Sequence, residues 1–435
     1  MSNPQKFAVI GAGAGGLAAA RHLKDRGFLV TLFEIGSRIG GLWVYENDSG
    51  RSPAYKSLRI NSEQRVSSYV DFPFPDGTQL YPGTDEMEAY FNSYADAHGL
   101  REHIRFNSKV EAIQPEVDGS YQIRSVDGNV ELFDGVVVAS GHQSIPRHPP
   151  QVEGFSGEYI HAHQYRTPKP YHERSVLVIG PGNSGVDIAA DICTVTKQTF
   201  LAARSPVLIM PRLMFGVPNS RILGKIEKPW LPWKLRVWMR TLIVQMFHGR
   251  MEQWGFRTPK GRTHPISHPT LISHIAWNRV TAKPGLDRAD GRIVHFTDGS
   301  SEYVDAIIAA TGYETDLPFL PNGINPIRGT HMHLYNRIVH PDMPHLYFVG
   351  FFDVTGGSNI RMMDDQSVYV AAAASGAIKL PSQMAMRQAI GADLAFQKRQ
   401  FPDSLRYGLE LDPVRYRRGL ARDKPSRGHC QIKLA

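Results

Sequence analysis

Two glycine-rich turns, far apart in the chain, carry the clearest chemical signal of this sequence. Each has glycine at its first, third and sixth positions, namely Gly11, Gly13 and Gly16 in one turn and Gly180, Gly182 and Gly185 in the other. An apolar run precedes each turn and a helix-like run follows it. In a strand–turn–helix arrangement the glycines allow a tight turn, and backbone N–H groups at the helix start approach a pyrophosphate. The sequence therefore predicts two dinucleotide sites.

The residue that ends the next strand distinguishes the two sites. Glu34 follows the apolar run 28–33, where a carboxylate can accept hydrogen bonds from both hydroxyls of a ribose. In the second site the run 199–203 ends at Arg204 and Ser205, and a guanidinium favours a 2′-phosphate. We predict an FAD site at the first turn and an NADPH site, rather than an NADH site, at the second. For the first site the alternative is an ordinary glycine-rich turn with an exposed Glu34. For the second site the alternative is that Arg204 is an exposed surface arginine.

The elements around the two turns follow one plan. In each module the chain continues into a predicted antiparallel β segment, at 106–138 and 293–309. The last strand of each segment is apolar, as expected for a buried strand, and a glycine follows it. A proline-rich linker, 145–150, joins the modules, and no third fingerprint follows Thr311, so the chain must return to the first module. The pattern predicts an α/β fold with two Rossmann-like dinucleotide-binding domains (FAD and NADPH), the NADPH domain inserted into the FAD domain.

The predicted boundaries divide the chain into four parts. The FAD-binding domain comprises residues 1–143 and 311–413, the NADPH-binding domain comprises 144–310 with a helical insertion at about 213–265, and a basic tail spans 414–435. In the tail, seven Lys or Arg residues oppose one acid, whereas the rest of the chain carries only about +2 of the formal net charge of +8. A solvated end is favoured over a binding arm, and no nucleic-acid partner is predicted.

The cysteine count and the hydropathy of the sequence indicate the cellular compartment of the protein. Cys193 and Cys430 alone are present, which excludes a disulfide framework. No charged and apolar leader precedes the first strand, and no uncharged apolar run reaches about 18 residues. We expect a cytoplasmic protein without a transmembrane anchor. No metal site is predicted, because a proline interrupts the helical register of the clustered histidines His264, His268 and His274.

The insertion contains one amphipathic stripe. Its apolar residues recur at helical spacing: Leu235, Trp238, Met239, Leu242, Ile243 and Met246. Lys234, Arg236 and Arg240 flank it. Packing of the stripe against the body of the protein or against a second subunit is the favoured interpretation, and weak contact with a membrane surface is the alternative. A homodimer is therefore left open.

Over nearly its whole length the chain resembles the flavin-containing monooxygenase family, the class B flavoprotein monooxygenases, and within it a soluble, microbial-type member. The features that carry this resemblance are the first glycine fingerprint with Glu34, GGLW at 40–43, Asn61-Ser62, the spaced signature Phe155, Gly157, His161 and Tyr165, GPGNSG at 180–185 and ATGY at 310–313. Baeyer–Villiger relatives have a tryptophan followed by proline or aspartate where this chain has Tyr165-Arg166. That difference favours oxygenation of a heteroatom over oxidation of a ketone.

The resemblance implies a reaction. NADPH would reduce FAD, reduced flavin and O2 would form a 4a-hydroperoxide, and one oxygen atom would pass to a soft nitrogen or sulfur nucleophile, a small-molecule amine or sulfide. Baeyer–Villiger oxidation of ketones is the nearest alternative. A protein that does not oxygenate is the other, either an NADPH oxidase that releases H2O2 or a redox-sensing binding protein.

The resemblance also assigns roles to single residues. Asn61 is expected to be catalytic by positioning NADP+ and the hydroperoxide, and a turn or cap residue is the alternative. His161 is expected to link the domains rather than to donate a proton, and no FAD role is expected for Asp353, which two phenylalanines separate from Gly350. The residues assigned to cofactor binding are Gly11, Gly13, Ala14, Gly15, Gly16, Glu34, Gly41, Leu42, Trp43, Asn61, Ser62, Val110, Gly180, Gly182, Asn183, Ser184, Gly185, Arg204, Ser205, Thr311, Gly312 and Gln366.

Overall fold

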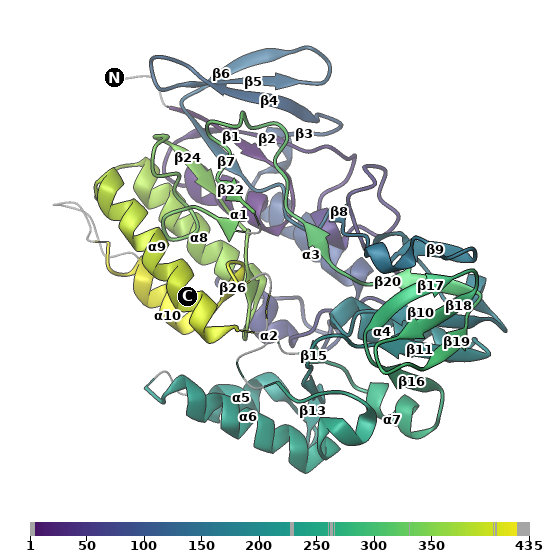
Figure 1. Ribbon diagram of the computed structural model, residues 1–435. Helices are drawn as coiled ribbons and strands as arrows, with labels where there is room; N and C mark the ends of the chain where they lie inside the picture. The colour runs from purple at the N-terminus through teal and green to yellow at the C-terminus, as the bar shows by residue number, and fades with distance from the viewer. Residues whose placement is uncertain are drawn as a thin grey trace.

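Two five-stranded parallel sheets, one for each glycine turn, form the centre of the structure (Figure 1). The structure is a computed structural model, and it describes residues 5–226, 230–259, 261, 264, 266–329, 331–402, 404 and 407–423. In Figure 1 the first module occupies the upper part of the molecule and the second module its lower right.

The first sheet is built from strands that are distant in sequence. Its order is β24 (Leu346–Phe348), β7 (Gly135–Val138), β1 (Lys6–Ile10), β2 (Leu29–Phe33) and β3 (Ile104–Arg105), with every neighbouring pair parallel. Helix α1 (Ala14–Lys24) packs against α8 (Asn359–Ala374) and α3 (Thr84–Ala97). The central strands are fully buried, as expected for a parallel sheet with covered faces.

The second sheet repeats this plan. Its order is β16 (Val280–Lys283), β11 (Gln198–Ala202), β10 (Ser175–Ile179), β20 (Ala306–Ala309) and β9 (Glu158–His161), again parallel throughout. Helix α4 (Asn183–Ile192) packs against β10 and β11, and α7 (Leu271–Ala276) packs against α4. Both glycine turns therefore lie where a central strand passes into a helix.

The second module is inserted into the first. The chain leaves the first module through β8 (Ile145–Pro146) and returns through β21 (Tyr313–Glu314), and these two strands pair antiparallel with each other. After the return, β24 joins the first sheet beside β7. The predicted fold class, with two Rossmann-like units and one inserted into the other, is confirmed.

Each module also carries a three-stranded antiparallel sheet. One contains β4 (Val110–Pro115), β5 (Tyr121–Ser125) and β6 (Val130–Phe133), and the other β17 (Leu286–Asp290), β18 (Ile293–Phe296) and β19 (Ser301–Tyr303). In each module the last strand of the predicted antiparallel segment (106–138 or 293–309) is wrong as one continuous strand, because residues 130–138 divide into β6 and β7 and residues 301–309 divide into β19 and β20. The breaks fall at Asp134 and Asp305, whose carboxylates accept hydrogen bonds from the first backbone N–H of β1 and of β10, at 2.6 and 2.9 Å.

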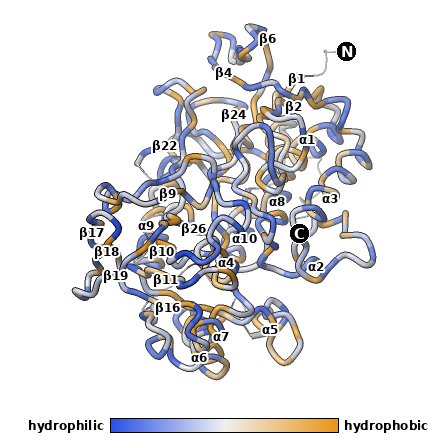
Figure 2. The backbone as a smooth tube through the Cα atoms, turned by 90° about the vertical axis from the view of Figure 1, so that its right-hand side faces the viewer, coloured by the Kyte–Doolittle hydropathy of each residue, from blue (hydrophilic) through white to orange (hydrophobic). Residues whose placement is uncertain are grey.

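The insertion forms a separate layer at the lower end of the molecule in both views (Figures 1 and 2). Its elements are β12 (Ile209–Met210), β13 (Leu213–Met214), β14 (Val217–Pro218), α5 (Asn219–Ile226), α6 (Trp233–His248) and β15 (Ile266–Ser267). The expectation that the apolar stripe of α6 packs against the body is wrong for most of its members. Trp238 and Met246 are 59% and 69% exposed, whereas the buried residue of α6 is Val244, on another face of the helix.

The C-terminal part is more ordered than its basic composition indicates. Helix α9 (Gln383–Gln400) is followed by β26 (Glu410–Leu411), which pairs with β25 (Asp353–Val354), and by α10 (Pro413–Leu420). The predicted solvated tail does not begin at Val414, because Arg417 of α10 forms an ion pair with Asp365 of α8 at 2.6 Å. Residues 424–435 of the predicted tail lie outside the described residues. Short elements complete the chain: α2 (Gln64–Ser67), β22 (Ile327–Arg328) and β23 (His331–Met332).

Candidate functional site

A cavity of about 1170 Å³ lies between the two modules, and residues of both glycine turns line it together with parts of the insertion and of α10. Small-molecule sites usually measure roughly 300–1,000 Å³. The cavity is therefore large enough for more than one ligand, as two dinucleotides require. From the sequence, the meeting of the two cofactors was expected only through the family resemblance, which implies that Asn61 positions both NADP+ and the hydroperoxide.

The first glycine turn forms one end of the cavity. Gly11, Gly13, Ala14 and Gly15 line it, and the φ of +103° at Gly11 is one that residues with a Cβ rarely adopt. Gly16 lies behind the turn. A Cβ on Gly16 would lie 1.8 Å from the carbonyl oxygen of Gly11, so this glycine is required for close packing of α1 on β1 rather than for direct contact with a ligand.

Glu34 lies on the cavity wall where the ribose of an adenosine is expected. Its carboxylate accepts hydrogen bonds from the backbone N–H of Ala12 at 2.7 Å and of Gly36 at 2.9 Å. Burial raises the pKa of Glu34, and these two N–H groups oppose that rise. Each carboxylate oxygen has a second lone pair. The Glu34 carboxylate can therefore also accept hydrogen bonds from the two ribose hydroxyls of FAD. The residues at this end of the cavity thus fit FAD.

The second glycine turn repeats the geometry of the first. Gly180 has a φ of +105°, and a Cβ on Gly185 would lie 1.9 Å from the carbonyl oxygen of Gly180. Asn183 and Ser184 begin α4 and line the cavity, and the buried Oδ1 atom of Asn183 has no hydrogen-bond partner among the described residues. The donors that suit a bound pyrophosphate at this end of α4 are the backbone N–H groups of its first turn rather than this side-chain oxygen, which can only accept.

The residues expected at the NADPH 2′-phosphate are not among those that line the cavity. Arg204 and Ser205 follow β11 and are exposed. The guanidinium of Arg257, also exposed, donates a hydrogen bond to the carbonyl oxygen of Arg204. The guanidinium of Arg257 thus lies beside the backbone of Arg204 at the end of β11. The sequence analysis missed Arg257, because it comes from a separate segment with no motif of its own.

Two histidines of the signature segment, His161 and His163, lie at the junction of the modules. Nε2 of His161 is 3.1 Å from the carbonyl oxygen of Gly312, and Nε2 of His163 is 2.9 Å from that of Gly50. Burial lowers the pKa of His161 to about 4, so the ring is neutral at neutral pH. These contacts support a structural link rather than a proton donor. Thr311 belongs to the same junction, because its hydroxyl donates to the carbonyl oxygen of Arg147.

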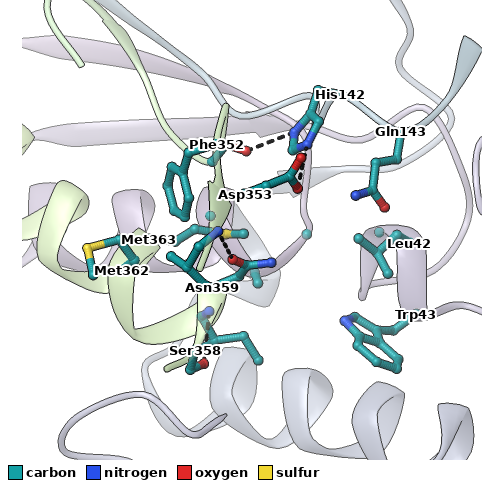
Figure 3. A pocket seen from close by; sticks show the side chains of 18 of the residues that line it. Leu42, Trp43, His142, Gln143, Phe352, Asp353, Ser358, Asn359, Met362 and Met363 are labelled. Carbon is teal, nitrogen blue, oxygen red and sulfur yellow. Dashed lines mark hydrogen bonds and ion pairs between the residues drawn. The ribbon is translucent and has the colours of Figure 1, made fainter. Parts of the chain in front are cut away.

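The middle of the cavity lies between the GGLW segment and the start of α8. Figure 3 shows Leu42 and Trp43 on one side and Ser358, Asn359 and Met363 on the other. Gly41, Ser62 and Val110 also line the cavity. The wall is mixed, because Leu42, Trp43 and Met363 present apolar side chains that can exclude water, whereas Ser358 and Asn359 present polar ones.

Asp353 and Gln366 differ from expectation. Asp353, for which no cofactor role was expected, lines the cavity and lies 3.4 Å from Nε2 of His142 (Figure 3). Gln366, which was expected to bind a cofactor, is fully buried, and its side chain accepts from the Gly350 N–H at 2.9 Å and donates to the Tyr416 hydroxyl at 2.8 Å. We therefore leave Gln366 out of the proposed ligand contacts.

Asn61 lies on the cavity wall, and its side-chain oxygen accepts a hydrogen bond from Arg212 of the second module at 3.1 Å. The three histidines considered for metal binding have other surroundings. His268 lies 3.4 Å from Asp187, His264 lies 3.6 Å from Glu410, and His274 packs against an indole ring. Among the described residues, no three His, Cys, Asp or Glu side chains gather as a metal site.

Known proteins match this chain over most of its length. Flavin-containing monooxygenase 5 of Rattus norvegicus is 30% identical over 439 residues, which cover 94% of this chain and 81% of that protein. Flavin-containing monooxygenase 3 of Homo sapiens is 30% identical over 425 residues, which cover 92% of this chain and 79% of that protein.

Solved structures share the fold. S-allyl-L-cysteine S-oxygenase from Allium sativum matches with a TM-score of 0.74 and 26% identity over 99% of this chain and 90% of that one. OTEMO, in a complex with FAD and NADP, matches with a TM-score of 0.73 and 17% identity over 97% and 98%. The model of the family described as Flavin-binding monooxygenase-like matches residues 4–423, and the chain belongs to this family.

Proposed function

We propose that the protein is an NADPH- and O2-dependent monooxygenase that transfers one oxygen atom to a soft nitrogen or sulfur nucleophile, an amine or a sulfide. The observation that carries this proposal is the single cavity that joins an acid-marked glycine turn to a second glycine turn of the same geometry. Relatives named as flavin-containing monooxygenases and as an S-oxygenase support it.

Different residues of the cavity bind the two cofactors. Glu34 binds the ribose of FAD. Gly13 and Gly41 line the cavity without side chains, so a pyrophosphate can approach the backbone N–H groups at the start of α1. The start of α4, with Asn183 and Ser184, binds the pyrophosphate of NADPH. Bound FAD supplies the hydride acceptor and the centre at which O2 is activated. The protein's own part is to align the two cofactors, to exclude water and, through Asn61, to donate a hydrogen bond beside the reacting atoms.

A substrate panel tests this function. Purified holoenzyme is given NADPH and O2 with a tertiary amine, a thioether or a cyclic ketone, and product is measured against NADPH consumed. We expect the N-oxide or sulfoxide to account for most of the NADPH. A lactone from the ketone as the main product would support the Baeyer–Villiger alternative. Release of H2O2 with every substrate and no oxygenated product would contradict oxygenation.

Removal of one arginine side chain should separate NADPH from NADH. We expect Arg204→Ala to raise the KM for NADPH by about tenfold to a hundredfold, because a charge-assisted contact with the 2′-phosphate is lost. The KM for NADH should stay unchanged. Steady-state kinetics with both nucleotides measure this. Arg288→Ala, which removes an exposed arginine of β17, is the control, and equal losses for NADPH and NADH in Arg204→Ala would contradict the assignment.

The insertion has an exposed set of apolar side chains, an apolar face, that could contact a partner molecule or a membrane. Its members, 39% to 88% exposed, are Leu213, Phe215, Val217, Trp230, Leu235, Trp238, Leu242 and Met246. The rings of Phe215 and Phe247 lie 4.8 Å apart and connect the β13–β14 hairpin to α6. Residues 213–250 contain seven Lys or Arg and one acid, a net charge of +6. Arg221 and Arg236 are paired with Glu63 and Asp412, so the segment retains about four positive charges beyond these pairs.

This combination favours an anionic membrane surface as the partner of the apolar face. Two copies of one positive surface repel each other, whereas anionic lipids attract basic segments and tryptophan favours the interface. Among the described residues, no helix is both long and apolar enough to cross a bilayer. We propose a cytoplasmic protein that touches the membrane only through this face.

Vesicle binding tests the apolar face. We expect the holoenzyme to sediment with vesicles of phosphatidylcholine and phosphatidylserine and much less with phosphatidylcholine alone, because the attraction is partly electrostatic. Trp238→Glu with Leu242→Glu should abolish sedimentation, whereas Met384→Glu, at an exposed position of α9, should not. A stable homodimer in solution that the double substitution dissociates, with no vesicle binding, would assign the face to a second subunit instead.

A further inference from the structure

We propose that Arg212 is a positioning residue that fixes the orientation of the Asn61 side-chain amide and so makes Asn61 a hydrogen-bond donor toward the cavity. This inference rests on the proposed function, since it concerns how the same cavity handles NADP+ and oxygen. It goes beyond that function because it assigns a task to a residue that has no motif and does not line the cavity.

The geometry ties Asn61 to the opposite module. Asn61 belongs to the first module, and Arg212 lies just after β12 of the insertion. Nη2 of Arg212 donates to Oδ1 of Asn61 at 3.1 Å, and Nε donates to the carbonyl oxygen of Ser267 at 3.3 Å. The Arg212 side chain is only 8% exposed. The guanidinium is therefore held at two of its nitrogen atoms, and one of these contacts reaches across the junction.

Other contacts fix Arg212 from behind. The Tyr81 hydroxyl donates to the Arg212 carbonyl oxygen at 2.8 Å, and the ring of Tyr81 lies 5.5 Å from the guanidinium carbon. Asp187 of α4 supplies the opposite charge, with Oδ1 at 3.7 Å from Nη2. A cation held by an anion, a carbonyl oxygen and an aromatic ring has little freedom to turn away from Asn61.

Asp187 is itself oriented by neighbours from both modules. The Tyr55 hydroxyl of the first module donates to its Oδ2 atom at 2.9 Å, and Nε2 of His268 lies 3.4 Å from Oδ1. Nδ1 of His268 accepts the backbone N–H groups of Thr270 and Leu271, so the proton of the neutral ring lies on Nε2 and points at the carboxylate. The pair Arg212 and Asp187 thus has hydrogen bonds that offset the cost of burying its charges.

The chemistry of the two groups decides what Asn61 presents to a ligand. A guanidinium can only donate hydrogen bonds, so the atom of Asn61 that faces it must be the oxygen. The amide nitrogen is then left to donate to a molecule in the cavity. Without Arg212 the amide could turn and present an acceptor instead, and that would repel a ribose oxygen of NADP+ or an oxygen of the bound reactants.

Substitutions of Arg212 and Asn61 in the holoenzyme test this role. We expect Arg212→Gln to keep FAD bound, to raise the dissociation constant of NADP+, measured without turnover, and to raise the fraction of NADPH lost as H2O2 by about tenfold. Asn61→Ala should do the same. The double variant should be no worse than either single one, because both act through one hydrogen bond.

Two further variants separate positioning from docking of the modules. Asn61→Asp retains a partner for Arg212 but loses the N–H donor, so we expect H2O2 release as high as in Asn61→Ala. Arg221→Ala removes a different junction contact, the ion pair with buried Glu63 at 2.6 Å, and should lower the melting temperature without changing H2O2 release. Arg212→Lys, which still donates, should restore part of the wild-type behaviour.

The pH dependence provides a second measurement. Burial raises the pKa of Asp187 to about 6, and Tyr55, Arg212, His268 and Asp191 are the titratable groups around it. Above that pH the carboxylate is charged and holds Arg212, and below it the charge is lost. We expect H2O2 release by the wild type to rise as the pH falls through about 6, and to be independent of pH in Asp187→Asn.

The outcomes distinguish this inference from the proposed function. If the wild type yields no oxygenated product, the function fails, but NADP+ affinity still tests the positioning role by the same double-variant comparison. Unchanged NADP+ affinity and H2O2 release in Arg212→Gln, or additive effects in the double variant, would overturn the inference while leaving the function in place.

Discussion

Replacement of Gly16 by alanine is expected to give a protein that purifies without FAD. The added Cβ would lie 1.8 Å from the carbonyl oxygen of Gly11 and 2.9 Å from its carbonyl carbon. Both are backbone atoms, so no side chain can move aside, and the turn would have to open by about 1.5 Å to restore van der Waals contact. Opening it displaces the N–H groups that hold the pyrophosphate. The ratio of flavin to protein absorbance measures the loss directly.

The control for this substitution is a glycine with open space around it. Gly391 lies inside α9, and a Cβ there would meet nothing within 4 Å. Gly391→Ala should retain full FAD and gain up to about 1 kcal/mol of stability, because alanine favours a helix. Full flavin content in Gly16→Ala would show that the first turn is not the FAD site.

The parts of the fold that depend on local pattern could be predicted from the sequence. An apolar run, a spaced glycine turn and a helix start are neighbours in the chain, so Gly16 and Gly185 identified both central strand–helix units. Glu34 could be identified because it directly follows the second strand of the first strand–turn–helix–strand unit. In the structure a Cβ added to either glycine would lie at nearly the same distance from the turn oxygen, 1.8 Å at Gly16 and 1.9 Å at Gly185, so both positions meet one physical requirement.

Other features could not be predicted because their partners are distant in sequence. The stretch 130–138 contains Glu131, Asp134 and Gly135 among apolar residues, and 303–309 contains Asp305. The local pattern does not show that Asp134 and Asp305 accept hydrogen bonds from the first N–H groups of β1 and β10, which is where the strands break. A basic stretch such as 414–420 indicates a solvated tail until Asp365 is found opposite Arg417. An amphipathic pattern predicts that α6 has an apolar face but says nothing about what covers it.

The candidate site shows the same division. Residues within a fingerprint, such as Asn183 and Ser184, were found from spacing alone. Arg212 and Asp187 were not identified, because they lie on separate elements of the second module, the insertion and α4, and meet only when these elements pack together. A signal existed for Asp187, since it follows the second glycine turn by two residues, but its buried position beside Arg212 has no counterpart in the local pattern.

Replacement of Gly185 by alanine should remove the use of NADPH while leaving FAD bound. Its Cβ would lie 1.9 Å from the Gly180 carbonyl oxygen and 3.1 Å from the Ala310 side chain. The second turn must then distort, whereas the first module keeps its own turn intact. We expect the KM for NADPH to rise at least about a hundredfold, because several backbone contacts with the pyrophosphate are lost together. Reduction by dithionite should proceed normally, which shows that flavin is present and reducible.

Gly182 provides the matched contrast, because it belongs to the same turn and faces open space. A Cβ on Gly182 meets nothing within 4 Å, so Gly182→Ala should fold with an unchanged melting temperature, whereas Gly185→Ala should melt earlier. The methyl group of Gly182→Ala instead occupies the path by which a pyrophosphate approaches the backbone, so NADPH binding should weaken without loss of stability. Normal NADPH kinetics in Gly182→Ala would mean that no pyrophosphate approaches this turn. In that case the glycines of the second turn would serve packing only. NADPH would then have to bind at another part of the cavity.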